Sequence, residues 1–186
     1  MTNSIYFLRH AKTKVDLSVP VREWSITDEG LALTKELAKS EKLSSIDGII
    51  HSSEPKAQQT AEAFAEGLDV QMYQLSGFDE LRREHGGVLS EEEYRDRVRK
   101  TLTNLDENVV GWESGSSALE RFEDAVRKVD IMFHQKNILV VSHGIVLTLY
   151  FSKLKGFLDI AFERWSQLEY LTWGLVRDNR VLVDIV

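Results

Sequence analysis

Three short apolar runs, each followed directly by polar residues, constrain the fold of this 186-residue chain more than any other feature. Such runs are typical of strands that are buried on both faces of a parallel sheet. Ligands bind at the carboxyl ends of the strands in sheets of this kind, so the polar residues are expected to lie along one edge. The runs with their polar ends are Ile5 to Leu8 with Arg9-His10, Ile46 to Ile50 with His51-Ser52-Ser53, and Ile138 to Val141 with Ser142-His143-Gly144.

Helix start signals lie between these runs. They are Thr27 before Asp28-Glu29, Ser90 in a capping box with Glu93, and Ser117 in a capping box with Glu120. After Ser117, apolar residues from Leu119 to Phe133 recur at three- and four-residue steps and mark a buried helix face.

Weaker strand signals complete the pattern. Residues 70–75 predict a strand, and residues 170–176 with 181–185 predict a hairpin around Asp178-Asn179. Helices that alternate with strands predict an α/β fold, a three-layer α/β/α sandwich with a mostly parallel central sheet. We expect residues 1–186 to form one domain, because a chain of this length buries one sizeable core.

Charge and terminal residues narrow the choice of partners and location. The net charge of −7 repels polyanions, so nucleic acid is not an expected partner, although a small anion can bind in a local positive pocket. The first residues lack the basic and apolar segments of a signal peptide, and no apolar run approaches membrane-spanning length. We therefore expect a cytoplasmic protein without a membrane partner.

Two histidines, His10 and His143, follow the ends of two predicted strands. A single histidine in such a place is more often structural, but two at one sheet edge favour a joint chemical role. A neutral imidazole can attack phosphorus, and it can donate a hydrogen bond to a phosphoryl oxygen. Arg9 lies beside His10, and its planar guanidinium suits phosphate. These residues predict a pocket for a phosphoryl group.

Signals for metal or cofactor chemistry are missing from the sequence. His51, His85 and His134 have no spacing typical of metal ligands, and neither a Gly-Lys-Ser/Thr phosphate loop nor a His-Glu-x-x-His motif is present. The chain has no cysteine, which excludes a thiolate metal site, a cysteine nucleophile and a disulfide scaffold. We expect catalysis without a metal or another cofactor.

Leu8 to Thr13 resembles the motif that opens the histidine phosphatase superfamily (phosphoglycerate mutase-like, branch 1), where a glycine more often follows the histidine. Three later segments resemble further motifs of this family and stand in the same order. They are Trp24 to Gly30, Ser52 to Ala61 and Ser142 to Gly144. Four ordered matches over nearly the whole chain are far more specific than one, and they imply the phosphoglycerate mutase-like fold.

The resemblance also implies roles for individual residues. His10 would be the nucleophile, and Arg9 and His143 would bind the phosphoryl group. Thr13 would be a further phosphate contact.

Lys56 departs from the family pattern, because an arginine usually stands at this position. A lysine keeps the positive charge but loses the two-pronged geometry of a guanidinium. Lys56 is therefore either a phosphate ligand or a solvated helix residue. Arg82 or Arg83, from the polar stretch over residues 77–93, is a candidate to supply the second guanidinium.

The same polar stretch is expected to hold the general acid. The resemblance implies a glutamate two residues after an apolar residue, and Glu80 in Phe78-Asp79-Glu80 fits that spacing. Glu84 competes with Glu80 for this role. A carboxylic acid near the leaving oxygen can supply a proton, which contributes about 10²–10⁴ in rate.

These observations predict a histidine acid phosphatase-type phosphomonoester hydrolase that forms a phosphohistidine on His10. Its substrate would be a small phosphomonoester or a phosphoprotein. Two other interpretations stay open. One is a phosphoglycerate mutase-type phosphotransferase, and the other is a catalytically weak phosphate-binding module, which the lysine at position 56 favours.

Overall fold

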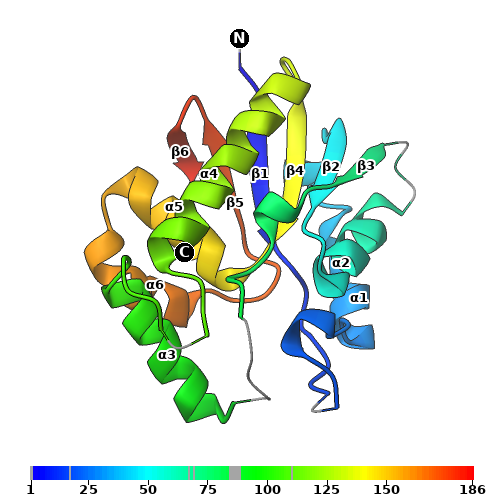
Figure 1. Cartoon of the computed structure of the whole chain (residues 1–186). Coiled ribbons are helices and arrows are strands. Elements are labelled where there is room, and N and C mark those ends of the chain that lie inside the picture. Colours follow the sequence, from blue (N-terminus) through cyan, green and yellow to red (C-terminus); the bar gives the residue numbers. More distant parts are fainter. Residues whose placement is uncertain (1, 17, 67, 69, 84–88, 110) are drawn as a thin grey trace.

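The central sheet is mostly parallel, as predicted. The computed structural model describes residues 2–16, 18–66, 68, 70–83, 89–109 and 111–186. In these residues six strands form one sheet in the order β3-β2-β4-β1-β5-β6. β3, β2, β4 and β1 run parallel, β5 runs antiparallel to β1, and β6 runs antiparallel to β5 (Figure 1). The strands are β1 Ser4–Arg9, β2 Gly48–His51, β3 Gln71–Gln74, β4 Asn137–Ser142, β5 Trp173–Arg177 and β6 Arg180–Val183.

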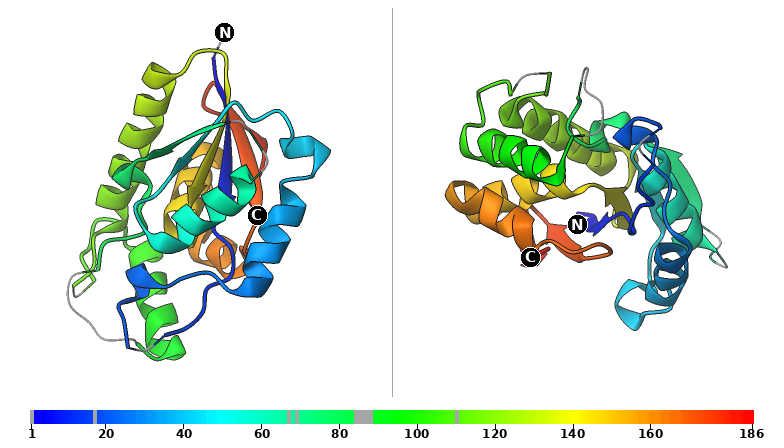
Figure 2. Two further views of the ribbon diagram at one scale, coloured as in Figure 1. Left: turned by 90° about the vertical axis from the view of Figure 1, so that its right-hand side faces the viewer. Right: turned by 90° about the horizontal axis from the view of Figure 1, so that it is seen from below.

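Helices cover both faces of the sheet and form the outer layers of the sandwich (Figure 2). Alternating residues of β1 point to opposite faces, as a strand requires. Ile5 and Phe7 pack in the larger apolar cluster with α4 and α5, whereas Leu8 packs in a second cluster with α2. The helices are α1 Asp28–Leu37, α2 Pro55–Ala65, α3 Glu91–Thr103, α4 Gly115–Met132, α5 Gly144–Lys155 and α6 Ala161–Gln167. Short 3₁₀ turns are η1 Val21–Glu23, η2 Glu41–Leu43, η3 Ser76–Phe78 and η4 Leu158–Ile160.

Helix α5 is the central helix of the fold. Every residue of it from Gly144 to Ser152 is buried, so it lacks the polar face of a surface helix. His143 is its N-cap residue and follows β4 directly. The start of α5 therefore lies at the carboxyl edge of the sheet. Within the described part of the chain, no helix is both long and apolar enough to cross a bilayer.

The predicted hairpin and two of the three predicted helix starts are confirmed. Asp178 and Asn179 join β5 to β6 with φ values of 52° and 57°, as a tight hairpin turn requires. Thr27 caps α1 by accepting a hydrogen bond from the Gly30 backbone N–H, and Ser90 and Glu93 form the capping box of α3.

The predicted start of α4 at Ser117 is wrong. The helix begins at Gly115, and the Ser114 hydroxyl accepts a hydrogen bond from the Ser117 backbone N–H. Close packing explains the earlier start. A Cβ atom at position 115 would lie 2.8 Å from Leu105 Cδ2 and 3.0 Å from the Thr101 carbonyl oxygen. The glycine lets the first turn of α4 approach the end of α3, a contact that local sequence does not reveal.

Candidate active site

The polar ends of β1, β2 and β4 meet at one edge of the sheet, as the three apolar runs predict. The backbone N–H of His10 donates to the Ser142 carbonyl at 2.9 Å, and that of Ser52 donates to the Val141 carbonyl at 3.1 Å. The ring centroids of His10 and His143 lie 5.1 Å apart. The structure thus brings together the two histidines that are far apart in the chain.

His10 is held in one tautomer by the residue that follows it. Its Nδ1 lies 2.8 Å from the Ala11 carbonyl oxygen, and because a carbonyl only accepts, Nδ1 carries the proton. Burial lowers the pKa of His10 well below its usual value of 6.5, and the neighbouring His143 and the charge of Lys56 act in the same direction. The ring is therefore neutral near pH 7, and Nε2 keeps a free lone pair.

Helix α2 anchors the loop after His10 through a buried threonine. The Thr60 hydroxyl accepts a hydrogen bond from the Ala11 backbone N–H at 3.0 Å and donates to the Lys56 carbonyl at 2.7 Å. Ala11 and Thr60 have no exposed surface. Since the Ala11 carbonyl orients the His10 ring, Thr60 fixes that ring indirectly.

His143 is fully buried at the start of α5. Its Nε2 lies 2.6 Å from the Ser52 hydroxyl, and its Nδ1 has no hydrogen-bond partner among the described residues. Burial is the main cause that lowers the pKa of His143 well below 6.5, followed by the charges of Lys56 and Arg83. The ring is neutral and can donate one hydrogen bond.

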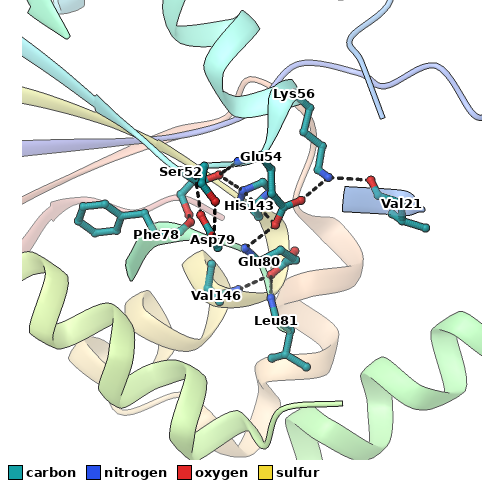
Figure 3. Close-up of polar contacts among 12 residues, drawn as sticks. Val21, Ser52, Glu54, Lys56, Phe78, Asp79, Glu80, Leu81, His143 and Val146 are labelled. Atoms are coloured by element: carbon teal, nitrogen blue, oxygen red, sulfur yellow. Dashed lines mark hydrogen bonds and ion pairs between the residues drawn. The ribbon is translucent and has the colours of Figure 1, made fainter. Parts of the chain in front are cut away.

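Lys56 is buried, so its interpretation as a solvated helix residue is wrong. Only 5% of it is exposed. Its ammonium binds the carboxylate of Glu54 and donates to the Val21 carbonyl at 2.9 Å (Figure 3). Sequence reasoning assigned no role to Glu54. The available signal was its position three residues after the end of β2 and directly before Pro55, the first residue of α2.

Glu80 lies at the start of α5, close to His143. Its carboxylate oxygens accept hydrogen bonds from the backbone N–H groups of Ile145 and Val146 at 3.1 and 3.2 Å. Anions are stabilised at a helix N-terminus, where N–H groups lack partners within the helix. The competing residue Glu84 lies outside the described residues.

Arg121 holds the chain segment that carries Glu80. Its guanidinium donates to the carbonyls of Gly77, Asp79 and Glu80 at 2.9, 3.0 and 3.3 Å, and it forms an ion pair with Glu113. The segment after η3 is thus fixed to α4.

Arg9 reaches the start of α5 from the end of β1. One of its terminal nitrogens donates to the Leu168 carbonyl, and its guanidinium lies 4.2 Å from the ring centroid of Tyr170. A Cβ atom at Gly144 would lie 3.4 Å from the guanidinium carbon and from Nε. Nε is buried and has no partner among the described residues. The glycine leaves room for this guanidinium beside the two histidines.

Arg83 is the more suitable of the two loop arginines to supply a second guanidinium. Its guanidinium contacts the rings of Tyr94 and Trp112, with distances of 5.0 and 4.6 Å to their centroids, and its charge lowers the pKa of His143. Arg82 is exposed.

Thr13 lies farther along the loop after His10 and forms an isolated bridge with Ile26. It is half-buried. Its predicted contact with phosphate stays a prediction.

The described part of the chain holds no group of three or more His, Cys, Asp or Glu residues that could bind a metal ion. The polar groups at the carboxyl edge of the sheet are cations, neutral imidazoles and carboxylates. This arrangement suits an anionic group held by charge and hydrogen bonds.

Solved structures with the same fold cover nearly the whole chain. YhfR from Bacillus stearothermophilus is 19% identical with a TM-score of 0.77, and the match covers 97% of this chain and 95% of that chain. The α-ribazole phosphatase from Shigella flexneri is 16% identical with a TM-score of 0.77, with coverage of 98% and 95%. A phosphoglycerate mutase from Bacillus anthracis str. Sterne is 17% identical with a TM-score of 0.74, with coverage of 100% and 93%. At these identities the likeness shows the fold alone.

A search of curated proteins by sequence finds no match. The model of the histidine phosphatase superfamily (branch 1) matches residues 5–177, which include both histidines, Lys56 and Glu80. The resemblance noted in the four sequence motifs is thereby confirmed, and the chain belongs to branch 1 of the histidine phosphatase superfamily.

Proposed function

We propose that this protein is a phosphomonoester hydrolase that acts through a phosphohistidine on His10. The observation that carries the proposal is the hydrogen bond from His10 Nδ1 to the Ala11 carbonyl, together with the lowered pKa of the ring. Both leave Nε2 neutral and unprotonated, as a nucleophile must be. Arg9, Lys56 and His143 lie close enough to His10 to lower the pKa of its ring, and we infer that they supply the donors for phosphoryl oxygens.

The reaction has two steps. In the first, Nε2 of His10 forms a bond to phosphorus while the ester P–O bond breaks, and the leaving oxygen takes a proton from Glu80. In the second, water attacks phosphorus, its proton passes to the Glu80 carboxylate, and the P–N bond breaks with its electron pair returned to Nε2. Charge on the phosphoryl oxygens is stabilised by Arg9 and Lys56, the main task of a phosphoryl-transfer site.

Glu80 supports the proposed acid role through its place beside His143. To donate a proton, its carboxyl group has to take one up and turn an oxygen from α5 toward the leaving group. Glu84 is the alternative candidate for the general acid. Exchanging each glutamate for glutamine and comparing alkyl with aryl phosphates distinguishes them, because only the poor alkyl leaving group needs the proton.

The test is a panel of small phosphomonoesters and a phosphopeptide in metal-free buffer, with wild type, His10→Ala and His134→Ala. His134 is exposed and serves as the matched histidine control. We expect hydrolysis by wild type and His134→Ala only, and a phosphoryl label on His10 that survives base and is lost in acid. Turnover by His10→Ala close to wild type would refute the mechanism, and a rate restored only by a divalent ion would refute metal independence.

Two other functions share this pocket. A phosphoglycerate mutase-type phosphotransferase would form the same phosphohistidine but pass the phosphoryl group to a bound acceptor instead of water. A weak phosphate-binding module is favoured by one observation, the engagement of Lys56 by Glu54. Stoichiometric phosphohistidine followed by release of inorganic phosphate supports the hydrolase. For its setting we propose the cytoplasm, with neither nucleic acid nor membrane as partner.

A further inference from the structure

Glu54 is a buried carboxylate inside the pocket that the proposed mechanism leaves without a role. Its side chain is 6% exposed. One carboxylate oxygen binds the Lys56 ammonium. The other accepts a hydrogen bond from the Glu80 backbone N–H at 2.9 Å and lies 3.7 Å from Nε2 of His143 (Figure 3). Glu54 thus engages donors that a phosphoryl oxygen would otherwise use.

The charges around the pocket are balanced before any anion binds. In the described residues they are the cations Arg9, Lys56, Arg83 and Arg121, the carboxylates Glu54, Asp79, Glu80 and Glu113, and the neutral rings of His10 and His143. The Asp79 carboxylate points to Ser53 and accepts hydrogen bonds from its backbone N–H and its hydroxyl. A dianion that enters this pocket meets the Glu54 carboxylate at close range, and little water is available to screen their repulsion.

We propose that Glu54 competes with the phosphoryl group for Lys56 and His143 and so weakens anion binding in this pocket. An anion binds fully when the Glu54 carboxylate turns away and releases the ammonium and the His143 ring. This inference rests on the proposed function only in assigning the phosphoryl group to this pocket. Protonation of His10 and His143 would also strengthen anion binding, so the experiment is carried out at about pH 8, where both rings are neutral.

Sulfate is the probe, because it carries two negative charges at this pH, as the phosphoryl group does. Its affinity is measured by calorimetric titration. Glu54→Gln is expected to bind sulfate about tenfold more tightly than wild type, whereas Glu54→Asp, which keeps the charge, is expected to bind as weakly as wild type. Glu62→Gln removes the same charge from the exposed side of α2 and is expected to match wild type.

Glu54→Gln leaves Lys56 as an unpaired buried cation, which can impair folding. The double variant Glu54→Gln with Lys56→Gln has no such charge, and it is expected to bind sulfate more weakly than Glu54→Gln because it lacks the freed ammonium. A double variant that binds sulfate as tightly as Glu54→Gln would show that the gain does not come from Lys56, and it would overturn the proposal. Equal sulfate affinity of wild type and Glu54→Gln would also overturn it.

The same data separate this inference from the proposed function. Sulfate binding that responds to Glu54 in a protein without phosphatase turnover would refute the hydrolase and leave the competition intact. Phosphatase turnover by a protein whose sulfate affinity is the same in wild type and Glu54→Gln would refute the competition and leave the hydrolase intact.

Discussion

Replacing Thr60 by valine tests whether α2 orients the nucleophile. Valine keeps the shape of threonine but removes the hydroxyl that accepts from the Ala11 backbone N–H. Both residues are fully buried, so water cannot replace the lost partner. An unsatisfied buried donor costs about 1–3 kcal/mol in the free energy of unfolding. The Lys56 carbonyl loses a donor too, but it keeps its place in the hydrogen-bond ladder of α2.

The assays are urea unfolding and thermal unfolding, both followed by circular dichroism, together with kcat/KM for a phosphomonoester. For a chain of this size the melting temperature should fall by roughly 2–12 °C. Thr60→Ser keeps the hydroxyl and is the matched control, with near wild-type kcat/KM. Thr60→Val should also lower kcat, because the Ala11 carbonyl no longer fixes the His10 ring. A free energy of unfolding within about 0.5 kcal/mol of wild type for Thr60→Val would refute this reasoning.

Three further predictions concern the charged groups of the site. Lys56→Ala should lower kcat/KM by at least roughly tenfold, about 1.4 kcal/mol of transition-state stabilisation. It should also lower the free energy of unfolding by about 3–5 kcal/mol, because Glu54 stays buried without its partner. Unchanged kinetics would show that Lys56 does not act in the site. Glu80→Gln should slow alkyl phosphates much more than aryl phosphates in steady-state assays, and equal slowing of both would argue against an acid role. The pKa values of His10 and His143 are lowered in the folded protein, so the unfolded chain binds more protons as the pH falls through about 6.5, and the free energy of unfolding should decrease between about pH 7 and about pH 5.5. A flat profile from urea unfolding over this window would contradict the neutral state of the two rings.

The sheet and its functional edge were predictable because the signals are local. Each buried strand is a continuous apolar run, and the chain turns polar where the strand leaves the core. Because His10 and His143 follow strands that end at one edge of a parallel sheet, they were predictable as neighbours in space. The cap of α1 at Thr27 and the capping box at Ser90 were also predictable, since they depend on residues within one turn.

The partner of Lys56 was not predictable, because it depends on packing between distant segments. Glu54 is the N-cap residue of α2, yet its carboxylate makes no capping hydrogen bond and turns to the Glu80 backbone instead. That contact exists only once the segment after η3 has packed against β2 and α5. The start of α4 was mispredicted for a related reason, since both Ser114 and Ser117 are suitable caps and Gly115 settles the choice through its contact with α3.

The central place of β1 affects how the protein is made. β1 is synthesised first among the strands, but its neighbours in the sheet are β4 and β5, which are synthesised after most of the chain. During synthesis, β1 therefore stays unpaired until β4 and β5 have emerged from the ribosome. An unpaired apolar strand is prone to wrong pairing and aggregation. A nascent chain halted before β4 would lack both the partner strand of β1 and His143. Sulfate binding should first arise when the chain through β5 has left the exit tunnel.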